Sequence, residues 1–101
     1  MAKKQIIWSK RANTELVNVL EFFNERNGNT YYSAKILNEV EDILKVLSEN
    51  ELMGRLTSDR RSRVVVMEVY LIFYEVMDSK IEILSFWDNR QNNKKRIDSK
   101  D

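Results

Sequence analysis

Apolar residues recur at helical spacing in two stretches of the first half of the chain. The spacing predicts one helix over residues 10–26, with Ser9 as its N-cap, and a second over residues 31–48, with Thr30 as its N-cap. The two apolar stripes are Ala12, Leu16, Val19, Leu20 and Phe23, then Leu37, Val40, Leu44 and Leu47 with Ile36 and Ile43 beside them. Gly28 lies in the short connector and suits a left-handed helix end. An antiparallel helical hairpin is therefore expected.

Short runs of β-branched and aromatic residues make up most of the remaining pattern. They predict strands over residues 6–8, 64–67, 70–76 (YLIFYEV) and 81–87 (IEILSFW), with Asp78 and Ser79 in a tight turn between the last two. In the last strand Ile81, Ile83 and Trp87 share one parity, which predicts that they face the same side of the sheet. Residues 49–63, which include a basic group, are expected to form a surface loop.

The predicted order of elements is β-α-α-β-β-β, which is typical of the α+β class. We expect a helical hairpin packed on one face of a small antiparallel sheet, with the other face partly open and rimmed by cations. Residues 1–101 are interpreted as a single domain. Its polar, lysine-rich tail, from about residue 88 to residue 101, is expected to be loose or ordered only by a partner.

Composition removes several classes of chemistry. The chain has no cysteine and no histidine, so disulfides, thiol catalysis, and thiolate or imidazole metal sites are excluded, and we expect no cofactor and no metal. Its 17 basic and 16 acidic residues leave a formal charge of +1, which argues against a polycationic nucleic-acid binder. Bulky apolar runs are far shorter than the roughly 20 residues of a membrane helix. With no signal-peptide pattern at the start, a cytoplasmic protein without membrane contact is the expectation.

Two basic clusters are candidate binding surfaces. One lies in the loop before the second predicted strand, and the other follows the last strand with an aromatic residue just upstream. Guanidinium groups suit bidentate contacts with phosphate or carboxylate, and an aromatic ring beside cations suits stacking or packing under a partner. The residues predicted to bind a target are Arg60, Arg61, Arg63, Trp87, Arg90 and Lys95.

Aromatic side chains crowd the tip of the helical hairpin. Phe22 and Phe23 lie near the end of the first predicted helix, and Tyr31 and Tyr32 begin the second. One helical stripe cannot bury two adjacent phenylalanines equally. The aromatic surface that stays exposed predicts a docking surface for a partner helix or a second copy of the chain. The sequence leaves open whether the chain forms a homodimer.

The order of elements and four segments resemble the RelE/ParE superfamily of toxins from bacterial toxin–antitoxin pairs. The segments are IIWSKRA at residues 6–12, ELMGR at 51–55, YLIFYEV at 70–76, and IEILSFWDNRQNNKK at 81–95. The superfamily typically has an apolar strand followed by S-x-x-A, a P-x-x-G-R turn, a Y-x-I-x-Y strand, and an I-x-I-L strand that runs into a basic end. The usual proline of the turn is missing here. The resemblance implies a cognate antitoxin as partner, for which Phe22, Phe23, Tyr31 and Tyr32 are the candidate docking residues.

The resemblance leaves three functions open. ParE-like members resemble inhibitors that bind DNA gyrase, whereas RelE-like members resemble nucleases that cut mRNA on the ribosome. The nuclease would use Arg63, Arg90 and Lys94 as candidate catalytic residues, but the chain has no histidine and no tyrosine after Tyr74 to move protons near neutral pH. The sequence therefore favours the ParE-like, non-enzymatic interpretation. A non-toxic adaptor domain of the same fold is the third alternative.

Overall fold

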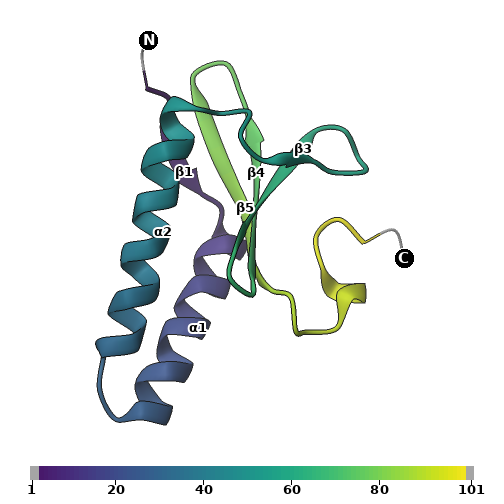
Figure 1. Ribbon diagram of the computed structural model, residues 1–101. Coiled ribbons are helices and arrows are strands. Elements are labelled where there is room, and N and C mark those ends of the chain that lie inside the picture. The colour runs from purple at the N-terminus through teal and green to yellow at the C-terminus, as the bar shows by residue number, and fades with distance from the viewer. Residues whose placement is uncertain (1–2, 100–101) are drawn as a thin grey trace.

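The computed structural model describes residues 3–99, which form two helices beside a five-stranded sheet (Figure 1). The elements are β1 (Gln5–Trp8), α1 (Lys10–Asn27), α2 (Tyr31–Glu49), β2 (Arg55–Leu56), β3 (Ser62–Met67), β4 (Tyr70–Val76) and β5 (Lys80–Asp88), followed by the short 3-10 helix η1 (Asn93–Lys95). The α+β class and the predicted order are confirmed. Within residues 3–99, no helix combines the length and apolar character needed to cross a lipid bilayer.

The sheet is mixed, with strand order β1-β5-β4-β3-β2. The predicted antiparallel meander is confirmed over β3, β4 and β5. Two features differ from the expected all-antiparallel sheet. β1 joins in parallel, with Ile6 opposite Ile81, because the helical hairpin carries the chain back along the sheet. β2 pairs with β3 inside the segment that was expected to be a loop; its two exposed residues carry no alternating pattern that could have marked a strand.

Local signals set the helix ends. The Ser9 hydroxyl accepts a hydrogen bond from the Ala12 backbone N–H at 3.0 Å, and Gly28 ends α1 in the left-handed region at φ 69°. Thr30 is the N-cap residue of α2, as predicted, but its side chain makes no capping hydrogen bond. The Asn29 carboxamide oxygen accepts from the Tyr31 N–H instead, at 3.1 Å, because its side chain reaches two residues forward.

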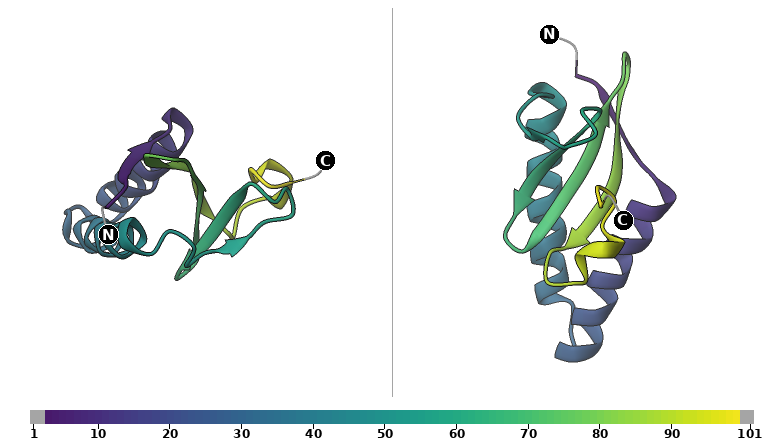
Figure 2. Two further views of the ribbon diagram at one scale, coloured as in Figure 1. Left: turned by 90° about the horizontal axis from the view of Figure 1, so that it is seen from above. Right: turned by 90° about the vertical axis from the view of Figure 1, so that its right-hand side faces the viewer.

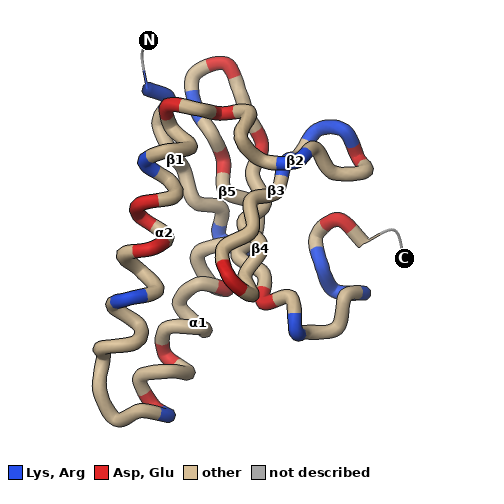
Figure 3. Tube along the Cα trace, in the orientation of Figure 1, with Lys and Arg blue, Asp and Glu red and all other residues tan. Residues whose placement is uncertain are grey.

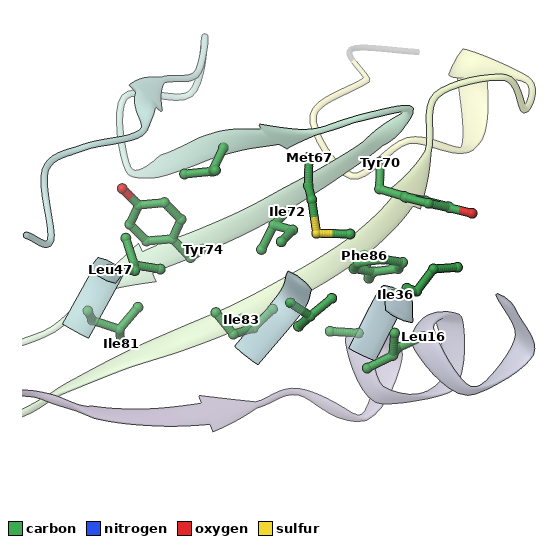
Figure 4. Packing of buried hydrophobic residues seen from close by; sticks show 13 residues of the cluster. Leu16, Ile36, Leu47, Met67, Tyr70, Ile72, Tyr74, Ile81, Ile83 and Phe86 are labelled. Atoms are coloured by element: carbon green, nitrogen blue, oxygen red, sulfur yellow. The ribbon is translucent and has the colours of Figure 1, made fainter. Parts of the chain in front are cut away.

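The main core lies between the helical hairpin and one face of the sheet (Figure 4). The whole α1 stripe contributes to it as predicted. On α2, Ile36, Val40 and Leu47 are buried in the core and Ile43 and Leu44 pack against it, as predicted, whereas Leu37 is 37% exposed and is the one departure from the predicted stripe. In Figure 4, Tyr70 and Tyr74 lie at opposite ends of this layer. The Tyr74 hydroxyl donates to the Glu51 carbonyl and accepts from the Gly54 N–H, each at 2.9 Å.

A β-bulge in β5 changes which side chains face the helices. The register places Tyr74 opposite Ile83 but Phe73 opposite Ser85, so one extra residue, Leu84, is inserted. Ile81, Ile83 and Phe86 therefore face the helices, while Leu84 and Trp87 face the other side. The prediction that Trp87 shares a face with Ile81 and Ile83 is wrong, because the bulge reverses the alternation.

The second face of the sheet is also covered. A smaller apolar cluster there contains Val64, Leu71, Phe73 and Trp87, with Leu84 and Ile97 packed against it. Ile97 belongs to the C-terminal segment, which lies across the sheet from the helices in both Figure 1 and Figure 2. The predicted loose tail thus lies against the sheet up to residue 99, where the half-buried Ile97 packs on the apolar cluster. Residues 100 and 101 lie outside the described residues.

The turn between β3 and β4 holds a strained residue. Glu68 adopts φ 56°, the left-handed region that glutamate rarely occupies. A hydrogen bond with the Glu68 carboxyl is the main cause that raises the pKa of Glu39 on α2 above its ordinary 4.5; desolvation and repulsion from Glu68 and Asp42 raise it further, and Lys35 opposes them. The turn therefore combines backbone strain with a pair of nearby carboxyl groups.

Replacement of Glu68 should stabilise the protein. The pH dependence of the free energy of unfolding should separate the effect of backbone strain at Glu68 from that of its carboxyl pair with Glu39. Glu68→Asn should gain about 1 kcal/mol over Glu68→Gln at every pH, because asparagine tolerates the left-handed region and glutamine does not. Because the folded-state pKa of Glu39 is raised, this group contributes stability that is fully present below pH 4.5 and is lost as pH rises above it. Both variants should reduce that loss in urea titrations. Equal stability of the two variants would contradict the strain.

Candidate functional site

A hollow of about 610 Å3 lies where the exposed flank of α1 meets the ends of β4 and β5. Apolar rings and chains form its floor, and charged groups stand at its rim. Its lining comprises Glu15, Asn18, Val19, Phe22, Phe23 and Arg26 of α1, Tyr32 of α2, Tyr70 of β4, Phe86 and Asp88 of β5, and then Arg90 and Gln91. We call it the α1–β5 pocket. A concave surface of this size, with a mixed apolar and charged lining, can enclose side chains of a protein partner, which a flat surface cannot do.

The structure brings three of the four predicted docking aromatics into this pocket. The Phe23 ring makes edge-to-face contacts with Phe22 and Tyr32, at centroid distances of 5.0 and 4.5 Å. Phe23 packs against the main core, whereas Phe22 is 55% exposed. Tyr31 is 83% exposed and does not line the pocket. An exposed ring held in place by a buried one is a suitable anchor for an apolar partner.

Most charges of the pocket are already paired. The Arg90 guanidinium binds the Asp88 carboxylate with two hydrogen bonds, at 2.9 and 2.7 Å, which lowers the pKa of Asp88 and raises that of Arg90. The Glu15 carboxylate accepts from the Ser85 hydroxyl at 2.7 Å and from the Phe86 N–H at 3.1 Å. Arg26, in the last turn of α1, has no hydrogen bond or ion pair within residues 3–99. It leaves a free positive charge at the rim.

The basic β2–β3 loop is shaped by one carboxylate. Asp59 accepts from the backbone N–H groups of Arg61 and Ser62, at 2.8 and 2.9 Å, and from the Thr57 hydroxyl. These bonds hold the pKa of Asp59 well below its usual range. Because the carboxylate is engaged with the backbone, it does not neutralise the exposed Arg60 and Arg61, which lie on the outer side of the sheet (Figure 3).

The remaining predicted target-binding residues lie in environments that differ from one to the next. The Arg63 guanidinium donates to the Gly54 carbonyl at 2.8 Å, so it supports the turn before β2. Trp87 is only 5% exposed. Lys94 and Lys95 are exposed on η1, on the same side of the sheet as the β2–β3 loop.

The three candidate nuclease residues do not form a cluster. Within residues 3–99, no hydrogen bond, ion pair or pocket lining joins any two of Arg63, Arg90 and Lys94. The same residues contain no group of three or more acidic side chains placed to hold a metal ion.

Sequence reasoning missed several residues of the pocket. Glu15 and Arg26 lie on the polar side of α1, and Asp88 lies at the end of β5, where charged residues are common. Tyr70 reaches the pocket from β4, and burial followed by the nearby Asp88 raises its pKa. No local pattern could have marked these residues, because the pocket forms between elements far apart in the sequence.

Comparisons with known proteins agree with this fold. The sequence matches, over residues 6–93, the family model described as "ParE toxin of type II toxin-antitoxin system, parDE". The fold is similar to a solved structure described as "Chromosomal ParDE TA system from P. aeruginosa", with a TM-score of 0.70 and 18% identity, covering 83% of this chain and 94% of that chain. No curated protein sequence matches the chain. Because the family match spans most of its length, the chain belongs to the ParE toxin family of type II toxin–antitoxin systems.

Proposed function

We propose that this toxin arrests bacterial growth by binding DNA gyrase, without cleaving RNA, and that a cognate antitoxin neutralises it. The observation that carries the proposal is the match to the ParE family over residues 6–93. The scattered placement of the nuclease candidates supports it. RNA cleavage needs a proton acceptor, a proton donor and cations gathered at one phosphate. Here Arg90 is held by Asp88 and Arg63 by the Gly54 carbonyl.

Two assays, run side by side, test whether gyrase is the target of the toxin. Purified toxin should inhibit supercoiling by purified gyrase, while mRNA ends mapped after induction in cells should match those of uninduced cells. Added antitoxin should restore supercoiling. Codon-phased mRNA cuts together with unaffected gyrase would overturn the proposal and favour a ribosome-dependent nuclease.

The α1–β5 pocket is the proposed docking site for the antitoxin. It offers an exposed phenylalanine over a half-buried one, beside a cation with no partner within residues 3–99. This combination suits an amphipathic antitoxin helix that inserts an apolar side chain next to a carboxylate. Asp88 and Glu15 do not repel such a segment strongly, because each carboxylate is paired with an arginine, Arg90 and Arg11 respectively.

Phe22 and Phe23 should respond differently to truncation. Phe22→Ala should leave stability almost unchanged but weaken antitoxin binding by about 1.5 to 3 kcal/mol, because the exposed ring becomes buried only in the complex. Phe23→Ala should instead lower the free energy of unfolding by about 2 to 3 kcal/mol, because its ring already packs on the core. Calorimetric titration and urea unfolding measure the two effects. The exposed Tyr31, changed to alanine, is the matched control.

A further inference from the structure

The apolar cluster on the second face of the sheet depends on the end of the chain for its cover. Residues 92–99, which we call the C-terminal cover, place Ile97 against this cluster. The guanidinium of Arg96 lies 6.0 Å from the Phe73 ring centroid. In Figure 1 the cover lies to the right of the sheet, away from the helices, and the view from above in Figure 2 agrees.

The cover is held mainly to itself. Its backbone hydrogen bonds join Lys95 to Asn92, Arg96 to Asn93 and Ser99 to Arg96, and the Arg96 side chain binds Asp98. For residues 92–98 of the cover, two such bonds reach the rest of the described chain: Arg11 donates to the Lys95 carbonyl at 2.8 Å, and Arg96 donates to the Asn89 side chain at 3.3 Å. The cover can therefore detach as a unit without breaking any strand pairing. Segments with so few outside contacts open first.

A buried donor lies in the covered face without a partner. Trp87 is 5% exposed, and its indole Nε1–H has no hydrogen-bond acceptor within residues 3–99. Buried tryptophan N–H groups are normally satisfied, since an unpaired donor loses its bond to water and gains nothing in return. The cover thus supplies the apolar contact of Ile97 but no acceptor. A partner that brings both an apolar side chain and an acceptor would fit this face better than the cover does.

Charges around the face indicate the chemistry of that partner. Lys94 and Lys95 on the cover and Arg60 and Arg61 on the β2–β3 loop are exposed, and their side chains have no ion pair within residues 3–99 (Figure 3). Their summed potential attracts negative charge. A carboxylate is also a strong acceptor for an indole N–H.

We propose that the C-terminal cover is a displaceable strap over a second binding face, and that an acidic, partly apolar protein segment takes its place on Phe73 and Trp87. This inference rests on the proposed function, in that the segment would belong to the toxin's target. When the strap opens, the partner's acceptor satisfies Trp87, and its carboxylates meet Arg60 and Arg61, which stay on the β2–β3 loop. The strap lowers the apparent affinity by the fraction of molecules in which it is closed.

The opening of the strap is measured on the free protein. Trp8 and Trp87 give two indole N–H signals in a nitrogen-15 NMR spectrum, and Trp87→Phe assigns them. Ile97→Asp should speed hydrogen exchange of the Trp87 indole about 10-fold or more, while the β3–β5 amides stay protected. Ile97→Ala, a milder change, should give a smaller increase of the same sign. Unchanged exchange in both variants would overturn the strap.

The binding face is tested with a synthetic peptide of alternating glutamate and leucine. The peptide should bind Ile97→Asp about 3- to 10-fold more tightly than the wild type, because no strap competes. It should bind Trp87→Phe about 5- to 10-fold more weakly, because one hydrogen bond is lost. Trp8→Phe is the matched control and should bind as the wild type does.

Two results would overturn the proposal: peptide binding that Trp87→Phe leaves unchanged, or preferential binding of a duplex DNA of equal charge. Because these measurements contain no gyrase, their failure is separate from failure of the supercoiling assay.

Discussion

Gly54→Ala is expected to lower the free energy of unfolding by about 2 to 4 kcal/mol, the combined effect of overpacking and a lost buried hydrogen bond. A Cβ atom at this position would lie 2.7 Å from the Tyr74 hydroxyl oxygen and 2.9 Å from the Val64 carbonyl oxygen. The second contact is with backbone, which cannot turn aside as a side chain can. Movement of Tyr74 would break its bonds to Gly54 and Glu51. The melting temperature should fall by roughly 10 to 20 °C.

Gly28→Ala is the matched control for this prediction. Nothing lies within 4 Å of a Cβ atom at Gly28, so only its left-handed backbone conformation, at φ 69°, opposes the change. The expected loss there is about 1 kcal/mol. Gly54 does not adopt a positive φ, so equal losses at the two glycines would contradict the close packing against Tyr74 and Val64 as the cause of a larger effect at position 54.

Glu15→Ala is expected to destabilise the protein by about 2 to 3 kcal/mol, because it leaves two groups of β5 without their charged acceptor. β1 ends opposite Ile83, so no neighbouring strand flanks that side of β5 beyond the bulge. The Glu15 carboxylate takes the strand's place by accepting from the Ser85 hydroxyl and the Phe86 N–H. Its ion pair with Arg11, at 3.5 Å on a partly exposed surface, adds little.

Two further variants, measured by urea unfolding, test why Glu15→Ala should destabilise the protein. Glu15→Gln keeps an acceptor oxygen at the same reach and should recover about half of the lost stability. Glu21→Ala, at an exposed position of the same helix, should change stability by less than about 0.5 kcal/mol. If Glu15→Ala were as mild as Glu21→Ala, the link between α1 and β5 would contribute little to the fold.

Much of the fold follows from local patterns in the sequence. The apolar stripe of α1, the serine before it and the glycine after it predict that helix within one residue at its end. The run YLIFYEV predicts β4 with its observed bounds, and the turn at Asp78 and Ser79 predicts the hairpin with β5. These signals can be recognised in the sequence because each involves residues that lie within one helical turn, or within one strand, of each other.

The candidate site was only partly predictable. Crowding of Phe22, Phe23 and Tyr32 is visible in the sequence, because the two helices meet at a short connector. Arg90 was predicted from its basic cluster after the last strand. Arg26 carries no such signal, because a charged residue at a helix end is ordinary. The pocket exists only once α1 lies against the end of β5, some 60 to 70 positions away along the chain.

The sequence alone determined the two helices, the order of β1, β3, β4 and β5 along the chain, and the family, since apolar period, capping residues and motif order are properties of neighbours along the chain. Tertiary structure decided three further features: the parallel pairing of β1 with β5, the bulge that turns Trp87 away from the helices, and the packing of Ile97 over the second face. Each depends on contacts between distant segments, whose free energy no local pattern records. A single inserted residue, Leu84, reverses the faces of the residues after it, which is why parity failed at Trp87.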